Sequence, residues 1–326
     1  MAVKPALVVL RALGLGDLLT AVPALRALAA AVPGRRVLLA PASLAQLVAA
    51  PLGYEVLDVH GVRAVPAALP SEATDCDVAV NLHGRGPQSH AALRTLRPGR
   101  LIAFAADGHD GPPWREDEHE VRRWCRLLEQ HGISADPADL HLRPPTVPAP
   151  EPARGATLVH PGAASGARRW PLDRWAAVVE SELAAGRRVA ITGDPREVAL
   201  ARRLAAISRL PDEAVLAGRT TIVELAAAVA AADRVVCGDT GVAHLATALG
   251  TPSVVLFGPT APARWGPPAD RQIHRALWTG RRGDPHAAEP DPGLLAIAPR
   301  MVIEELETLG SRARITATRG ATAWPS

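Results

Sequence analysis

Residues Leu7–Leu28 have the sequence LVVLRALGLGDLLTAVPALRAL, an apolar run followed by a glycine turn and a pattern typical of a helix. Four apolar residues lead to Arg11, and Gly14 and Gly16 then precede a single acid, Asp17. Glycine lets a backbone turn tightly and approach a ligand, and the helix N-terminus that follows favours an anion. The stretch therefore predicts a strand, a turn and a helix, with a carboxylate where the buried strand ends.

The local pattern leaves two interpretations of Asp17 open. It favours a helix N-cap, whose side chain bonds to the amide of Leu19 or Thr20, and it allows a functional carboxylate. The turn falls short of a dinucleotide fingerprint, because G-x-G-x-x-G requires glycine at the position of Leu19. A dehydrogenase is therefore the weakest candidate among nucleotide-binding enzymes.

Outward from this stretch, short apolar runs alternate with helix-like segments on both sides of a proline-rich stretch, Arg143–Pro152 (RPPTVPAPEP). Proline continues neither a helix nor a central strand, so this stretch is interpreted as a linker. The expected strands are Ala6–Leu10, Arg36–Ala40, Glu55–Val59, Val78–Asn81, Arg100–Ala103, Thr157–His160, Arg188–Thr192, Ala214–Leu216, Arg234–Cys237 and Ser253–Phe257. The expected helices are Leu18–Ala31, Leu44–Ala50, Leu172–Ala185, Arg196–Ile207, Ile222–Ala232, Val242–Leu249 and Pro299–Leu309.

Apolar strands that alternate with helices indicate parallel sheets covered on both faces. We therefore expect an α/β protein of two doubly wound domains that face a cleft. The expected boundaries are a first domain at 1–142, a linker at 143–153, a second domain at 154–298, a final helix at 299–310 and a loose tail at 311–326. Ligands of such sheets bind beyond the carboxyl ends of the strands.

Composition excludes several classes of protein. The 326 residues have a net charge of +3, from 36 basic and 33 acidic residues, which is too balanced to indicate nucleic-acid binding. Cys76, Cys125 and Cys237 are far apart and lack metal-ligand spacing, so neither a disulfide framework nor a zinc site is expected. No signal peptide or transmembrane segment is recognised, and a cytoplasmic protein is expected.

The stretch His160–Pro171, HPGAASGARRWP, follows the first strand of the second domain. Small residues expose backbone N–H groups, Ser165 adds a hydroxyl, and two arginines supply planar donor groups. These features suit a pyrophosphate-binding loop. A surface loop with a solvated arginine pair is the alternative.

The stretch Ile191–Ala199, ITGDPREVA, follows the next strand and places Glu197 near the start of a helix. A carboxylate at this position can bind a ribose diol, as the acid after the second strand does in dinucleotide folds. An acid favoured there by the helix dipole alone is an equally good interpretation.

The stretch Cys237–Thr260, CGDTGVAHLATALGTPSVVLFGPT, carries the strongest signal. Asp239, Thr240 and Gly241 open a helix after a buried strand, and His244 lies on its first turn. Taken singly, Asp239 is more often a cap and His244 a structural helix residue. Several loops of this kind after successive strands together indicate a phosphate-containing ligand.

These stretches resemble glycosyltransferase family 9, the heptosyltransferases of lipopolysaccharide synthesis and their relatives. The matching pieces run in the family's order from about Leu7 to Leu309, and the final helix matches as well. The resemblance implies the GT-B fold, with two Rossmann-like domains, the acceptor bound mainly by the first and the sugar nucleotide by the second. It also implies inversion of the anomeric centre without a metal or other cofactor, and a donor that is ADP-linked and heptose-like.

The resemblance also implies roles for individual residues. Asp17 matches the family's proposed general base, and Arg168 falls where the family often has a phosphate-binding lysine. In the block His160–Pro171, residues 163–165 replace the adjacent threonines of the lipopolysaccharide enzymes. The implied donor-binding residues are Ser165, Arg168, Glu197, Thr220, Asp239, Thr240, Gly241 and His244.

In the first domain, Asn81–His90 (NLHGRGPQSH) departs from the family pattern. Its polar side chains follow a strand, so they are expected to face the acceptor, with an ordinary polar loop as the alternative. The expected acceptor-binding residues are Gly16, Asn81, His83, Arg85 and Gln88.

Three hypotheses follow for the function. The first is an inverting, metal-independent glycosyltransferase that moves a sugar from a nucleotide-diphosphate donor to a hydroxyl of a saccharide or cell-envelope acceptor, which can be membrane-bound and reached from the surface. The second is a nucleotide-sugar epimerase or hydrolase on the same scaffold. The third is a non-catalytic nucleotide-sugar-binding protein, against which Asp17 argues, because a binder needs no base at that position.

Overall fold

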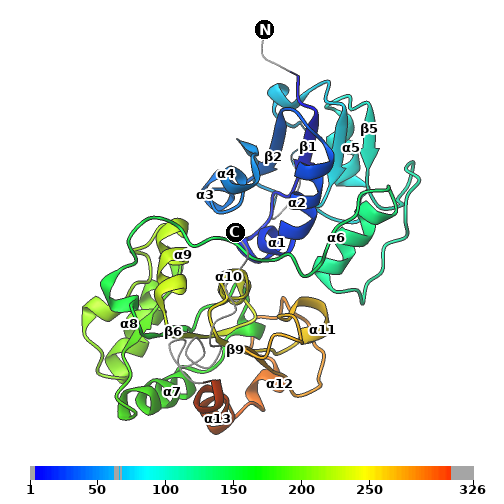
Figure 1. The fold of residues 1–326 in the computed structure, drawn as a ribbon. Helices are drawn as coiled ribbons and strands as arrows, with labels where there is room; N and C mark the ends of the chain where they lie inside the picture. Colours follow the sequence, from blue (N-terminus) through cyan, green and yellow to red (C-terminus); the bar gives the residue numbers. More distant parts are fainter. Residues whose placement is uncertain (1–3, 62–65, 67, 310–326) are drawn as a thin grey trace. The chain divides into compact units, whose positions relative to one another are not determined.

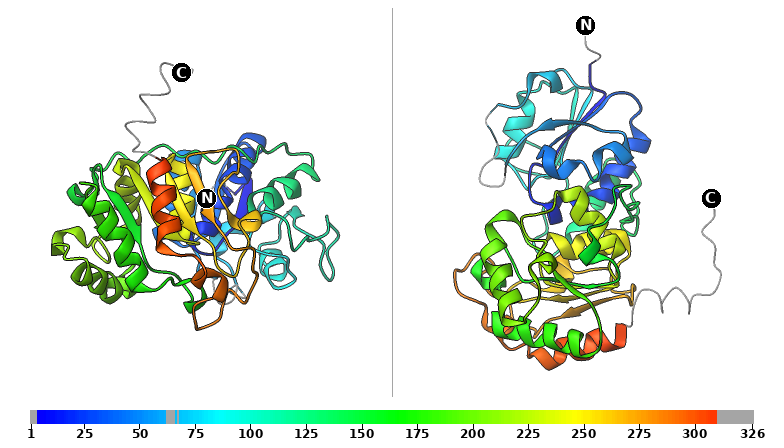
Figure 2. Two further views of the ribbon diagram at one scale, coloured as in Figure 1. Left: turned by 90° about the horizontal axis from the view of Figure 1, so that it is seen from below. Right: turned by 90° about the vertical axis from the view of Figure 1, so that its left-hand side faces the viewer.

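The computed structural model describes residues 4–61, 66 and 68–309. The chain forms two compact units, Met1–Leu140 and His141–Ser326, here called unit 1 and unit 2. Each is built on one five-stranded parallel sheet with helices on both faces (Figures 1 and 2). The proline-rich stretch has no helix or strand before a short 3-10 turn at Glu151–Ala153. The tail expected at 311–326, and Gly310 at the end of the expected last helix, lie outside the described residues.

The sheet of unit 1 has the strand order β3-β2-β1-β4-β5. Its central strand, β1, is LVVL and is buried along its whole length, as a parallel strand covered on both faces requires. The strands are β1 (Leu7–Leu10), β2 (Arg36–Ala40), β3 (Glu55–Asp58), β4 (Val78–Asn81) and β5 (Arg100–Ile102). The direction of winding reverses between β1 and β4, which pair in register, so the loops after these two strands form the expected ligand-binding edge.

Helix α2 of unit 1 packs against both α4 and α6, while α5 packs beside β4. The helices are α1 (Leu15–Thr20), α2 (Val22–Ala31), α3 (Ala42–Ala45), α4 (Ala49–Leu52), α5 (Gln88–Arg94) and α6 (Glu120–Glu129). Helix α6 buries Trp124 and Cys125 and exposes Glu129. Its packing on α2 brings a segment far along the chain next to the first strand–helix turn.

The sheet of unit 2 has the strand order β10-β9-β8-β6-β7. The strands are β6 (Thr157–His160), β7 (Val189–Ile191), β8 (Arg234–Gly238), β9 (Ser253–Leu256) and β10 (His274–Leu277). Helices α7 and α13 pack together, and so do α9 and α10, on opposite sides of the sheet in Figure 1. The winding reverses between β6 and β8, so the loops after β6 and β8 flank the expected ligand-binding edge.

The helices of unit 2 connect these strands and complete both faces of the sheet. They are α7 (Leu172–Ala184), α8 (Val198–Ile207), α9 (Ile222–Ala231), α10 (Gly241–Leu249), α11 (Pro262–Trp265), α12 (Pro292–Leu295) and α13 (Pro299–Leu309). A hydrophobic core around Trp170, Trp175 and Val236 packs between the sheet and α7, α8 and α13. No helix of the described residues is long and apolar enough to cross a membrane.

Several local predictions were wrong. The helix predicted over Leu18–Ala31 is two helices, and the helix predicted at Leu44–Ala50 is divided between α3 and α4. The strand predicted at Ala214–Leu216 makes only one bridge, between Ile191 and Val215. Strand β10 was not predicted, because it lies at the edge of the sheet and contains the polar residues His274 and Arg275, which break the apolar pattern of a buried strand.

Candidate active site

Asp17 lies in the turn after β1, on the first helical turn of α1. One carboxylate oxygen, Oδ2, accepts a hydrogen bond from the backbone N–H of Gly14 at 3.2 Å. The carboxylate therefore reaches back across the glycine turn, toward the residue that precedes the helix. The N-cap interpretation, with a bond to the amide of Leu19 or Thr20, was wrong: Gly14 is the N-cap residue, and Asp17 is the third residue of the helix.

Arg11, the residue after β1, is completely buried. Its guanidinium donates to the backbone oxygen of Asp17 (Nε, 2.9 Å) and to the backbone oxygen of Leu82 (Nη1, 2.5 Å). Nη2 contacts Thr20 Oγ1 at 3.3 Å, Asp17 Oδ1 at 3.5 Å and Glu120 Oε1 at 3.0 Å. One buried cation thus links the Asp17 turn, the loop after β4 and helix α6.

The pKa of the Asp17 carboxyl is raised, mainly because burial disfavours its charged form. The positive charge of Arg11 and the N–H of Gly14 act in the opposite direction, and the negative charge of Glu120 adds to the increase. The Asp17 side chain still keeps 30% of its surface exposed. A carboxylate with a raised pKa that remains reachable is a suitable proton acceptor.

The loop after β4 contains the predicted acceptor-binding residues. Asn81 is fully buried, donates to Gly84 O at 3.1 Å and Ser89 Oγ at 2.8 Å, and accepts from His83 N–H at 3.0 Å. Asn81 therefore orders its own loop instead of offering polar atoms to a ligand. Arg85 is exposed, and its Nη1 lies 3.4 Å from Glu116 Oε1.

The His83 ring is packed against Gly61, where a Cβ atom would lie 2.8 Å from His83 Cε1. Burial, with help from Arg11, lowers the pKa of His83 to about 4. The ring is consequently neutral at physiological pH, and its Nδ1 has no hydrogen-bond partner within the described part of the chain. Gly16 is half-buried in the Asp17 turn, and Gln88 is exposed at the start of α5.

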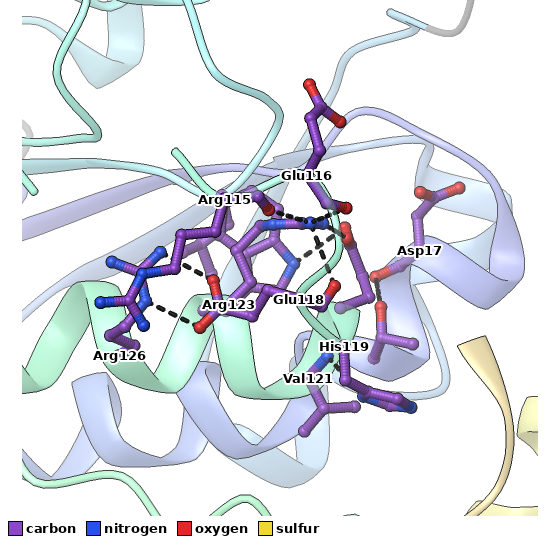
Figure 3. A network of polar contacts seen from close by, with 12 residues as sticks. Asp17, Arg115, Glu116, Glu118, His119, Val121, Arg123 and Arg126 are labelled. Atoms are coloured by element: carbon purple, nitrogen blue, oxygen red, sulfur yellow. Dashed lines mark hydrogen bonds and ion pairs between the residues drawn. The ribbon is translucent and has the colours of Figure 1, made fainter. Parts of the chain in front are cut away.

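A second polar network fixes the loop that leads into α6 (Figure 3). The Arg123 guanidinium donates through Nη2 to the backbone oxygens of Arg115 (2.8 Å), Glu116 (3.3 Å) and Glu118 (3.1 Å). Arg126 makes two 2.7 Å bonds to the Glu118 carboxylate. These contacts anchor the loop whose Glu116 meets Arg85. No signal in the sequence assigned Arg123 this role.

In unit 2, the loop after β6 contacts the loop after β8. Arg168 donates through Nη1 to Asp239 O at 3.2 Å and through Nε to Ser165 Oγ at 3.3 Å. The Ser165 hydroxyl itself donates to Pro285 O at 2.6 Å. Arg168 therefore spans the two loops beside the point where the sheet winding reverses, while Ser165 is engaged by a later segment of the same unit.

Some backbone N–H groups of this loop already donate hydrogen bonds to backbone oxygens of the same unit. The N–H groups of Ala167, Arg168 and Arg169 bond to Ala287 O, Ser165 O and Gly166 O, respectively. At Gly166 a Cβ atom would lie only 1.5 Å from Ala288 O, so the segment around residue 288 lies directly on this loop. These three amides are therefore bonded within the protein, although small residues in this loop were expected to expose backbone N–H groups.

Glu197 lies at the start of α8 and faces the end of β6. Its Oε2 accepts from Asp194 N–H at 2.9 Å and lies 3.8 Å from His160 Nε2. A Cβ atom on Gly162 would lie 2.0 Å from Glu197 Oε1, so only glycine permits this approach. Burial lowers the pKa of His160, whose Nδ1 meets Thr192 Oγ1 at 3.0 Å.

The loop after β8 contributes the remaining predicted donor residues. Asp239 is buried, and Thr240 precedes α10 without a side-chain cap to the helix. The buried Thr240 Oγ1 makes no well-formed hydrogen bond within the described chain. Burial raises the pKa of the nearby Cys237 thiol to about 12, and the Thr240 hydroxyl acts weakly in the opposite direction. Gly241 begins α10, and the His244 ring lies 5.9 Å from that of Trp265.

Thr220 is half-buried directly before α9, whose N-cap is Thr221. It lies in the loop that follows Gly218, and the N–H of Gly218 bonds to Gly193 O in the loop after β7. The described residues contain no cluster of three His, Cys, Asp or Glu side chains with metal-binding geometry.

The family model described as "Glycosyltransferase family 9 (heptosyltransferase)" matches residues 109–287, which is more than half of the chain. The chain belongs to glycosyltransferase family 9. The matched region contains all the predicted donor residues: Ser165, Arg168, Glu197, Thr220, Asp239, Thr240, Gly241 and His244.

Among curated relatives, this family 9 chain is 32% identical over 160 residues to lipooligosaccharide heptosyltransferase 2 of Haemophilus influenzae, covering 46% of this chain and 45% of the relative. It is 32% identical over 158 residues to lipopolysaccharide heptosyltransferase 2 of Escherichia coli, with the same shares covered. The chain thus matches about half the length of these relatives.

Solved structures match nearly the whole chain. The structure of E. coli ADP-heptose lps heptosyltransferase II has a TM-score of 0.71 and 21% identity, over 94% of this chain and 98% of that one. E. coli heptosyltransferase WaaC with ADP has a TM-score of 0.66 and 19% identity, over 93% and 99%. These matches confirm the predicted fold class, a GT-B fold with two Rossmann-like doubly wound units.

Sequence reasoning missed three groups near the predicted site residues: Glu120, His160 and Gly162. Each is explained only by a contact with a residue distant in sequence. Arg11 gave a detectable signal, because an arginine directly after a fully apolar strand is seldom buried unless it is paired.

Proposed function

We propose that this family 9 chain is an inverting heptosyltransferase, which moves heptose from ADP-heptose to a hydroxyl of a lipopolysaccharide-type saccharide acceptor. Unit 1 supplies the base and the acceptor contacts, and unit 2 binds the donor. The observation that carries the proposal is Asp17: a reachable carboxylate of raised pKa, at the ligand-binding edge of unit 1, in a chain of this family. A protein that only binds nucleotide sugars needs no such group.

In the proposed reaction, Asp17 takes the proton of the acceptor hydroxyl as that oxygen attacks the anomeric carbon. The new carbon–oxygen bond forms while the bond from the anomeric carbon to the diphosphate oxygen breaks. The electron pair of the broken bond leaves with ADP. Attack opposite the leaving group inverts the anomeric centre, and the proton remains on the Asp17 carboxyl until solvent removes it.

The leaving diphosphate gains negative charge, and unit 2 provides groups that stabilise it. We assign this role to the Arg168 guanidinium, the N-terminus of α10 and the Thr240 hydroxyl, which is buried there without capping the helix. Glu197, held by Gly162 and Asp194, accepts the ribose hydroxyls. His83, Arg85 and Gln88 are proposed to contact the acceptor, whereas Asn81 shapes their loop.

The pH dependence of kcat/KM should reveal the raised pKa of Asp17. Only the ionised carboxylate accepts a proton, so activity falls as the pH drops through the pKa of Asp17 in the folded protein. Because burial raises that pKa, the acid limb should lie above the value of about 3.9 for an ordinary aspartate. A pH–rate profile measured from pH 4 to 8 tests this, and an acid limb at or below the ordinary value contradicts it.

Arg168→Ala should weaken ADP binding. Loss of a charge-assisted phosphate contact costs about 1.5–3 kcal/mol, so the Kd should rise roughly ten- to hundredfold. Calorimetric titration with ADP measures the change, and Arg169→Ala, whose Nε instead bonds to Ala163 O, is the matched control. Equal losses in both variants would show that general positive charge, and not the Arg168 position, sets the affinity.

Gly162→Ala should weaken ADP binding through Glu197. The added methyl group overlaps the Glu197 carboxylate and must displace it. If the effect passes through Glu197, the double variant with Glu197→Ala binds ADP no worse than Glu197→Ala alone. Additive losses, measured by the same titration, would mean that Gly162 acts independently of Glu197.

The experiment that tests the function is transfer by the purified chain. ADP-heptose and a heptose-deficient lipopolysaccharide acceptor are incubated in buffer containing EDTA, and the product is detected by mass spectrometry. We expect an acceptor one heptose heavier and release of ADP. Release of free heptose without acceptor modification would instead support a hydrolase, and binding without turnover would support a non-catalytic binder.

A further inference from the structure

We propose that Glu120 is a positioning residue for the Asp17 carboxylate. Glu120 holds the buried guanidinium of Arg11 away from Asp17, so that Asp17 remains free to accept a proton. The inference rests on the proposed function, in which Asp17 is the base.

The first observation is that Arg11 lies between two carboxylates and favours one of them. Nη2 of Arg11 is 3.0 Å from Glu120 Oε1 but 3.5 Å from Asp17 Oδ1, which is at the limit of a hydrogen bond. The Glu120 side chain is 6% exposed and that of Asp17 is 30% exposed. The buried carboxylate therefore provides the main charge partner for Arg11, and the reachable one is left loosely paired.

The second observation is that Glu120 is itself held on three sides. The indole Nε1 of Trp124 donates to the same Oε1 at 3.1 Å, and Nη1 of Arg123 bonds to Oε2. The Arg11 guanidinium also lies over the Trp124 ring, 4.8 Å from its centroid. Because Arg123 and Trp124 belong to α6 as Glu120 does, they keep the Glu120 carboxylate from turning toward Asp17. If Arg11 moved away from Glu120, it would lose both this ion pair and its contact with the Trp124 ring.

The third observation is the charge balance around Asp17. The charged or titratable groups that face this cluster are Arg11 after β1, Glu120 and Arg123 on α6, and His83 in the loop after β4, which is neutral. Two guanidinium groups thus meet two carboxylates. Without the charge of Glu120, Arg11 would have Asp17 as its only carboxylate partner in the cluster and would stabilise its ionised form, making it a weaker base.

The test is a direct measurement of the Asp17 pKa by NMR titration of ¹³C-labelled aspartate carboxyl groups, assigned with Asp17→Asn. In Glu120→Gln the Asp17 pKa should fall by about one unit relative to the parent. Trp124→Phe removes a donor to the same Glu120 oxygen without changing any charge, and should shift the pKa least. Equal shifts in both variants would overturn the proposal, since they would reflect loosened packing.

Loosened packing alone would also lower the pKa of a buried carboxyl. A second variant is therefore needed for which the electrostatic account predicts a rise in the Asp17 pKa instead of a fall. Arg11→Gln removes the positive charge beside Asp17 and should raise its pKa. A fall in this variant would indicate simple exposure and would overturn the electrostatic account. If Glu120→Gln does not fold, the double variant Glu120→Gln with Arg123→Gln replaces it, because it removes one charge of each sign. The Asp17 pKa should still fall in the double variant, and an unchanged Asp17 pKa would overturn the proposal.

The titration needs no turnover, so it separates this inference from the proposed function. If the parent transfers heptose, the acid limb of kcat/KM should move in Glu120→Gln by the same amount as the Asp17 pKa, and a fixed limb would overturn the role in catalysis. If the parent fails to transfer heptose from ADP-heptose, the proposed function fails, and with it the positioning role.

Discussion

Asp17→Asn lowers the turnover of heptose transfer by about 10²-fold or more, because removing a general base usually costs that much. Asparagine keeps the size of the side chain, and its amide oxygen can still accept from the N–H of Gly14, but it cannot take a proton. Binding of ADP to unit 2 should be nearly unchanged. Steady-state rates and calorimetric titration of the same preparation measure both quantities.

The same variant should not lose stability. Because the pKa of Asp17 is raised on folding, the folded chain holds this proton more tightly than the unfolded chain. The stabilising contribution of Asp17 is therefore complete below its unfolded pKa and disappears as the pH rises through its folded pKa. Above the folded pKa of Asp17 the ionised side chain disfavours folding, so Asp17→Asn should unfold there at the same or a higher temperature. Parent-like turnover in this variant would reject Asp17 as the base.

Glu182→Ala is expected to destabilise unit 2 by about 3–5 kcal/mol, the cost of breaking a buried ion pair and leaving its partner charged. Glu182 is 1% exposed and accepts from Arg187 Nε at 2.9 Å and Nη2 at 2.6 Å. It also bonds to the Thr157 hydroxyl of β6 and lies 3.7 Å from the buried Arg234 of β8. Urea unfolding followed by circular dichroism measures the loss.

Glu151→Ala is the matched control for Glu182→Ala. Glu151 also pairs with arginines of unit 2, Arg154 at 3.2 Å and Arg188 at 3.6 Å, but its side chain is 74% exposed. Surface ion pairs contribute roughly 0–1 kcal/mol, so this variant should remain close to the parent. A similar loss of unfolding free energy in the two variants would mean that burial does not determine how much the Glu182 ion pairs contribute to stability.

Much of the fold was predictable from local pattern. Strand β1 is buried on both faces and is apolar along its whole length, and the buried strand β8 is apolar between Arg234 at its start and Gly238 at its end. This pattern makes both strands visible in the sequence. Edge strand β10 was missed for the converse reason, since one side of an edge strand tolerates polar residues such as Arg275. The segment Ala214–Leu216 is apolar enough for a strand but forms only one bridge.

For the predicted site residues, the sequence indicated the position in the fold but not the contacts of each side chain. Asp17, Arg168 and Glu197 were predicted to be site residues because each follows a strand, and the carboxyl ends of parallel strands share one edge of a sheet. The structure places each of them in the turn or loop after a strand. Asn81 was assigned to the acceptor on the same ground, yet its polar atoms are used within its own loop. Position after a strand identifies the edge, but it does not show which side chains stay free for a ligand.

The sequence by itself determined the two-unit α/β architecture, the family and the placement of Asp17 after the glycine turn that follows β1. Strand burial, glycine turns and helix starts depend on residues a few positions apart. Only the tertiary structure decided the partners of the buried charges. Buried Arg11 meets the Glu120 carboxylate across 109 positions, and buried Arg234 meets the Glu182 carboxylate of helix α7. A buried charge requires a partner wherever packing brings one, and packing is a property of the whole fold that no local pattern records.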